Sequence, residues 1–131
     1  PERLIGADPD FFVTQHLGRR HGGLAAFDTA ALAQYRAAFR EPDTIRASCE
    51  DYRAAATIDL VHDEADLDRK IRAPLLVLWG REGVMERCFR PLEDWAERAE
   101  SVSGRALECG HYLAEEQPAE TESELRRFFL S

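Results

Sequence analysis

Apolar residues recur at helical spacing through the first half of the chain. The first predicted helix begins at Asp8, a good N-cap residue. Pro9 suits the next position, because the N–H group that proline lacks would have no partner there. Further helices are predicted from Asp28 and from about Pro42. The acidic stretch at 62–68 predicts an exposed helix or connection, so this half is predicted to be helical.

The pattern changes after residue 70. Residues 74–79 form a continuous apolar run that Gly80 closes, which is typical of a strand buried on both faces of a parallel sheet. A helix is predicted over residues 91–99. A continuous apolar run is thus followed by residues at helical spacing. This half of the chain is therefore predicted to combine strands with helices.

A second strand is predicted over residues 105–109, after a turn at Ser103 and Gly104. His111 follows directly at the C-terminal end of this strand, and an amphipathic helix is predicted over residues 121–130. The predicted core face of that helix carries Leu125, Phe128 and Phe129.

Strand, helix, strand and helix in this order predict an α/β unit with two parallel strands. Two strands do not make a stable doubly wound sheet, because most of their lateral hydrogen bonds would lack partners. We therefore expect the sheet to continue, either in a segment that precedes these residues or across a dimer interface.

Composition limits the classes of partner. The 131 residues are 44% hydrophobic, enough for a sizeable core, and the formal net charge of −8 disfavours nucleic acid and anionic membranes. The longest apolar stretch, residues 73–79, is too short to cross a bilayer. Cys49, Cys88 and Cys109 are odd in number and lack metal-ligand spacing, which favours reduced thiols and a cytoplasmic location.

Several segments carry a family resemblance. Residues 71–80 resemble the penultimate strand of α/β-hydrolases, and residues 108–118 resemble their histidine loop. Residues 1–11 and 49–54 resemble the cap of haloacetate (fluoroacetate) dehalogenases. The resemblance covers essentially the whole chain and implies the C-terminal part of such an enzyme.

The implied organisation is a helical cap over residues 1–68, followed over residues 69–131 by the last two parallel strands and helices of the hydrolase sheet. In this family an aspartate attacks the carbon that bears the halogen, and a histidine oriented by a second carboxylate activates water to hydrolyse the resulting ester. The implied substrate is a small 2-haloacid. The resemblance implies no metal and no organic cofactor.

His111 matches the water-activating histidine. An unperturbed imidazole titrates near neutral pH, as a general base must, and the end of a parallel strand is where α/β sheets form their clefts. The alternative is a surface or structural loop histidine, and this is our expectation for His16, His21 and His62.

Tyr52 matches a cap tyrosine whose hydroxyl helps to hold the departing halide, where a phenolic O–H can donate to growing negative charge. The alternative is an ordinary core tyrosine, because Tyr52 follows Ile45 by seven residues and Cys49 by three on a predicted helix.

Three acidic residues lie near the predicted site. Glu82 is the acid nearest to where many α/β-hydrolases place the orienting carboxylate, but we expect that carboxylate to precede residue 1, as in dehalogenases. Glu115 and Glu116 lack a second cluster at ligand spacing, so we expect them to stabilise the N-terminus of the last helix.

The sequence contains no Gly-x-Ser/Asp-x-Gly nucleophile motif, so these residues alone are predicted to be inactive. Epoxide or ester hydrolysis by the same fold is the alternative reaction. The alternative of another class is a non-catalytic domain that forms a homodimer by strand or domain exchange. The short basic loop at residues 18–23 differs from related dehalogenases, which leaves the preferred halogen open.

Overall fold

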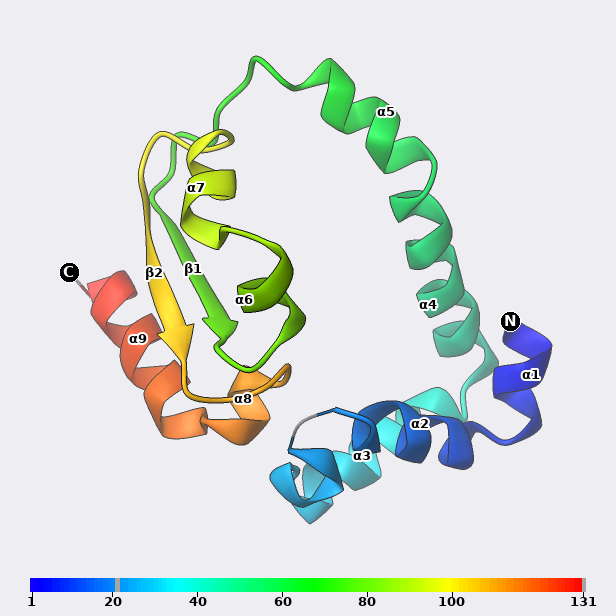
Figure 1. Ribbon diagram of the computed structural model, residues 1–131. Coiled ribbons are helices and arrows are strands. Elements are labelled where there is room, and N and C mark those ends of the chain that lie inside the picture. The colour runs from blue at the N-terminus through cyan, green and yellow to red at the C-terminus, as the bar shows by residue number, and fades with distance from the viewer. Residues whose placement is uncertain (21, 131) are drawn as a thin grey trace. The chain divides into compact units, whose positions relative to one another are not determined.

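The computed structural model describes residues 1–20 and 22–130, which form two compact units (Figure 1). The first unit comprises Pro1–Arg19 and Phe27–Asp68, and the second comprises Arg20–Ala26 and the chain from Arg69 on. Assigning the first 68 residues to one segment therefore differs from the structure at Arg20–Ala26. Within the second unit Gly22 packs closely on Glu116: a Cβ atom on Gly22 would lie 3.2 Å from the Glu116 side chain.

The first unit is entirely helical. The Asp8 carboxylate accepts a hydrogen bond from Phe11 N (2.9 Å), which confirms its role as an N-cap. Asp28 caps the third helix in the same way. The helices of this unit are α1 (Glu2–Ala7), α2 (Pro9–Gly18), α3 (Thr29–Phe39), α4 (Pro42–Ala55) and α5 (Ile58–Ala65).

The core of the first unit lies between α1 and α4. Ile5, Ile45 and Cys49 are buried there, and Phe12 and Phe39 pack against them. Ile45 and Cys49 were predicted to share one face of the helix from about Pro42. Both are buried on α4. The acidic α5 has no buried residue, which confirms the predicted exposed helix.

The second unit carries the strands. Its elements are the 3-10 helix η1 (Gly23–Ala26), β1 (Leu75–Gly80), α6 (Val84–Cys88), α7 (Pro91–Ala96), β2 (Val102–Leu107), α8 (Leu113–Glu116) and α9 (Pro118–Leu130). The strands β1 and β2 are parallel, with Leu75 opposite Val102 and Gly80 opposite Leu107. Figure 1 shows α6 and α7 on one side of the strands and α9 along the other. The predicted α/β unit with two parallel strands is confirmed.

The second strand begins earlier than predicted. Ser103 and Gly104, which were expected to form a turn, lie within β2. Gly104 has φ of 149°, and a Cβ atom there would lie 1.8 Å from the carbonyl oxygen of Val77. This glycine therefore allows a close approach of the two strands, which from sequence alone looks like a chain reversal.

Two predicted burial patterns are wrong. The apolar residues of β1 before Gly80 are only half-buried, because β1 pairs with β2 alone within the described chain. On α9, Leu125 and Phe129 are exposed, whereas Glu124 is buried with 5% of its surface accessible. The reason is Arg105 of β2, whose guanidinium lies against α9 and requires a carboxylate there. None of the helices within residues 1–20 and 22–130 is long and apolar enough to cross a membrane.

Candidate active site

His111 lies in the loop between β2 and α8, at the C-terminal end of the parallel strand pair. Its side chain is exposed, and the edge of its ring contacts the neighbouring Tyr112 ring, with centroids 5.0 Å apart and an angle of 78°. The structure thus places the histidine at the sheet end where α/β proteins bind ligands.

The backbone on either side of His111 is held by one carboxylate. The Oε2 atom of Glu116 accepts a hydrogen bond from Gly110 N (2.7 Å), and its Oε1 atom accepts one from Tyr112 N (3.0 Å). Glu116 ends α8 rather than starting the last helix, so the role expected for it is wrong. A sequence signal existed: an acid one turn inside a helix can reach back to the N–H of the N-cap residue, here Tyr112.

The loop also packs tightly against the end of β1. A Cβ atom on Gly80 would lie 1.6 Å from the carbonyl oxygen of Gly110, so only glycine fits at this position. Backbone hydrogen bonds join the two loops, from Arg81 N to Leu107 O (2.9 Å) and from Glu82 N to Cys109 O (3.0 Å). The ends of both strands therefore position the His111 loop.

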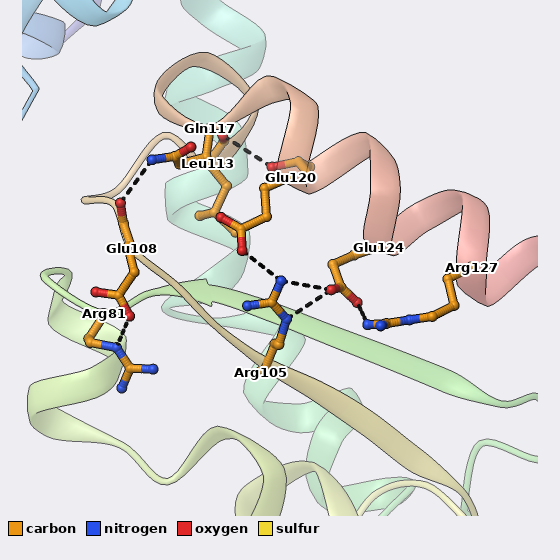
Figure 2. A network of polar contacts seen from close by, with 9 residues as sticks. Arg81, Arg105, Glu108, Leu113, Gln117, Glu120, Glu124 and Arg127 are labelled. Atoms are coloured by element: carbon orange, nitrogen blue, oxygen red, sulfur yellow. Dashed lines mark hydrogen bonds and ion pairs between the residues drawn. The ribbon is translucent and has the colours of Figure 1, made fainter.

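Side chains extend this link. Arg81 Nε donates to Glu108 Oε1 (2.5 Å), and Gln117 Nε2 donates to the Glu108 carbonyl (3.2 Å), as Figure 2 shows. The hydrogen bond that Arg81 donates to the Glu108 carboxylate also raises the pKa of the Arg81 guanidinium. Residue 108 thus connects the loop after β1 to the chain between α8 and α9.

A second ion-pair network joins β2 to α9. Arg105 binds Glu120 at 2.7 Å and Glu124 at 2.8 Å, and Arg127 donates a further hydrogen bond to Glu124 (Figure 2). The hydrogen bond from Arg105, aided by that from Arg127, holds the pKa of the Glu124 carboxyl below its ordinary value, although burial opposes this. This network fixes α9, the helix that follows α8, to β2.

Tyr52 lies on α4 of the first unit, and 74% of its surface is accessible. Ile45 and Cys49 are buried on the same helix, but the chain does not cover the tyrosine. The alternative of a core tyrosine is therefore wrong for this unit. Tyr52 and His111 belong to different units.

Other candidates have ordinary surroundings. The side chain of Glu82 is exposed. His16 stacks on Phe12 (5.5 Å between ring centroids) and His62 is exposed, whereas His21 lies outside the described residues. Within the part of the chain that the structure describes, no group of three or more His, Cys, Asp and Glu could hold a metal ion.

The cysteines are free, and they differ in environment. Cys88 is exposed, whereas Cys49 and Cys109 are buried. Burial raises the pKa of the Cys109 thiol, with nearby carboxylates adding to the effect. A protonated, buried thiol is a poor nucleophile, so Cys109 is best explained as a packed residue beside the His111 loop.

Fold and loop together define part of an α/β-hydrolase: a parallel strand pair with a histidine on the loop after the second strand. Comparison with solved structures supports this class. A protein of Nostoc sp PCC 7120 assigned as an α/β hydrolase matches 98% of this chain and 44% of its own, with a TM-score of 0.93 and 48% identity. A Pseudomonas aeruginosa protein assigned as an epoxide hydrolase matches 99% of this chain and 44% of its own, with a TM-score of 0.89 and 40% identity.

The resemblance to haloacetate dehalogenases is confirmed as well. The chain is 40% identical over 129 residues to a fluoroacetate dehalogenase of Burkholderia sp, a match that covers 98% of this chain and 42% of that protein. No protein-family model matches the chain. The chain spans less than half the length of each of these relatives, and its sequence and fold are consistent with their C-terminal part.

Proposed function

We propose that this chain supplies the general base, His111, of a hydrolase that cleaves the carbon–halogen bond of small 2-haloacids. The observation that carries the proposal is the His111 loop. Glu116 accepts hydrogen bonds from the backbone on both sides of His111, and Gly80 at the end of β1 packs against the Gly110 carbonyl. The imidazole of His111 stays exposed. The likeness to a fluoroacetate dehalogenase supports the substrate class.

The reaction has two steps. A carboxylate oxygen of an aspartate outside these residues attacks the carbon that bears the halogen; the new C–O bond forms as the carbon–halogen bond breaks, and the halide leaves with the bonding pair. In the second step His111 takes a proton from water, whose oxygen attacks the carbonyl carbon of the ester. The tetrahedral intermediate then expels the alkoxide, which takes the proton from His111 to give a 2-hydroxyacid.

Tyr52 serves the first step in this proposal. Its hydroxyl donates a hydrogen bond to the halide as negative charge grows on it, which lowers the barrier because the interaction is stronger in the transition state. Tyr52 is 74% exposed in its own unit, which leaves its hydroxyl open to a ligand.

The test uses the complete gene product. Halide release from fluoro-, chloro- and bromoacetate is followed with ion-selective electrodes, in wild type, His111→Ala and the matched control His62→Ala, which removes an exposed histidine on α5. We expect release by wild type and the control, and a loss of at least 100-fold in His111→Ala, as is usual for a general base. Equal rates in wild type and His111→Ala would refute the assignment.

Residues 1–131 alone contain no Gly-x-Ser/Asp-x-Gly motif. We therefore expect no turnover of any haloacetate by this isolated stretch. Halide release by the purified 131-residue protein at rates above those of buffer would contradict the mechanism.

A second reaction is favoured by the likeness to the Pseudomonas protein assigned as an epoxide hydrolase. An epoxide can be opened by the same attack of an aspartate and the same His111-activated water. Styrene oxide and p-nitrophenyl acetate are therefore assayed beside the haloacetates. Turnover of either without halide release would replace the dehalogenase proposal with epoxide or ester hydrolysis.

A function of another class is a non-catalytic domain that pairs with a second copy. The observation that favours it is the edge of β1, which has no second strand partner within the described chain. A homodimer formed by strand or domain exchange would cover this edge, and size-exclusion chromatography with light scattering measures it directly. The free cysteines support a cytoplasmic location in either case.

A further inference from the structure

Glu116 is the residue that joins the two peptide groups flanking His111. Its two carboxylate oxygens each accept one of these N–H groups, from Gly110 (2.7 Å) and from Tyr112 (3.0 Å). Because both bonds end on one rigid carboxylate, they fix the separation of the two amides and with it the backbone of His111. We propose that Glu116 is a positioning residue for His111, an inference that rests on the proposed function of the histidine.

The carboxylate is itself held in place. Glu116 N donates to Tyr112 O (2.8 Å), which closes the turn of α8 and brings the side chain under the loop. On its other side Gly22 packs closely: a Cβ atom there would lie 3.2 Å from the Glu116 Cγ and Cδ atoms. The Glu116 side chain therefore lies between Gly22 and the His111 loop. If it turned toward solvent, it would lose its hydrogen bonds to Gly110 N and Tyr112 N.

Such a fixed loop matters for an exposed base. A general base must stay within hydrogen-bond reach of the water that it activates, and small displacements lower the rate steeply. Hydrogen bonds to a charged acceptor are about twice as strong as neutral ones. Glu116 thus supplies to a surface loop the rigidity that burial would otherwise give, while the imidazole of His111 stays open to substrate.

The first test is made on the unmodified chain by NMR. Scalar couplings across hydrogen bonds are measured between the amide nitrogens of Gly110 and Tyr112 and the side-chain carboxyl carbon of Glu116. We expect both couplings to be detected. If neither amide couples to this carbon, the proposed contact does not exist in solution and the inference falls, whatever the activity of the protein.

The second test measures catalysis in the complete gene product. Glu116→Gln keeps the size of the side chain but leaves one acceptor oxygen, so one flanking amide loses its partner. We expect kcat to fall about tenfold with KM changed less than twofold, as the loss of one hydrogen bond to a charged group implies. The matched control is Glu100→Gln, an exposed acid of the second unit with no side-chain hydrogen bond or ion pair in the described chain.

A double-mutant cycle separates positioning from general structural support. If Glu116 acts through His111, Glu116→Gln should lower the residual rate of the His111→Ala protein by less than twofold. A tenfold loss in both backgrounds would overturn the positioning role. If the couplings are present but wild type has no hydrolytic activity, the contact stands and the proposed function fails, so the two failures are distinguished.

Discussion

The contact between Gly80 and the His111 loop allows a prediction of stability. In Gly80→Ala the new Cβ atom would lie 1.6 Å from the Gly110 carbonyl oxygen and 2.7 Å from that of Cys109. Both neighbours are backbone atoms, so no side chain can rotate to relieve the clash. The Gly110 oxygen would have to move by about 1.4 Å to reach the shortest tolerated separation of 3.0 Å.

The magnitude follows from what this shift breaks. The backbone bonds from Arg81 to Leu107 and from Glu82 to Cys109, now 2.9 and 3.0 Å long, would be lost or strained. Each contributes about 1 kcal/mol, and overpacking a tight site costs about 1–3 kcal/mol more. We therefore expect Gly80→Ala to lower the free energy of unfolding of the second unit by about 3–5 kcal/mol.

The assay is urea denaturation followed by tryptophan fluorescence. Both tryptophans, Trp79 and Trp95, belong to the second unit, so the signal reports on the unit that carries the clash. A loss of this size lowers the urea midpoint by about 1 M or more. Two-dimensional NMR spectra should show the largest shift changes in the loop around His111.

The control is Gly6→Ala. Gly6 lies in α1 of the first unit, where a Cβ atom would meet only Ile45 Cδ1 at 3.9 Å. Alanine is favoured over glycine in a helix by about 1 kcal/mol, so this variant should not lower the tryptophan-detected midpoint. A Gly80→Ala protein whose free energy of unfolding lies within about 0.5 kcal/mol of the wild-type value would refute the packing argument.

Three further predictions concern other residues. Glu124→Gln should lower the free energy of unfolding at pH 7, measured by urea denaturation. Because the pKa of Glu124 is lowered from 4.5 in the folded state, the difference in stability between wild type and variant should be present above pH 4.5. It should disappear as the pH falls through the lower folded-state pKa. Cys88 alone should react quickly with a thiol reagent in the folded protein, while Cys49 and Cys109 react only on unfolding; fast labelling of all three would contradict the burial. Tyr52→Phe should lower halide release by the complete gene product about tenfold without changing the melting temperature, and an unchanged rate would remove Tyr52 from the mechanism.

Much of the fold could be predicted from local patterns. The caps at Asp8 and Asp28 and the apolar run that ends at Gly80 are local signals, and α2, α3 and β1 begin or end where these signals predict. The short helices α1, α6 and α8 carry no such signal and were not predicted. The start of β2 was predicted too late, because glycine looks the same in sequence whether it makes a turn or, as Gly104 does, a close approach between strands. Telling the two apart requires knowledge of the partner strand.

The candidate site was predictable only in part. The position of His111 after a strand follows from the order of elements, but its support does not. Glu116 was expected to stabilise the N-terminus of the last helix, because the sequence does not show that the separate one-turn helix α8 ends on this residue. Its contact with Tyr112 N is of a kind that local sequence can signal, but its contact with Gly110 N is not. The burial of Glu124 likewise depends on Arg105, nineteen residues earlier, so helix periodicity alone predicts the wrong buried face.

The most direct test of the central claim, that His111 activates water to hydrolyse an ester intermediate, is the intact mass of the His111→Ala gene product after incubation with chloroacetate. We predict that halide is released once per active site and that the protein gains the mass of the acid without its halogen, because the ester forms but is not hydrolysed. Wild type and His62→Ala should show no lasting adduct. Continued turnover by His111→Ala without an adduct would contradict the claim.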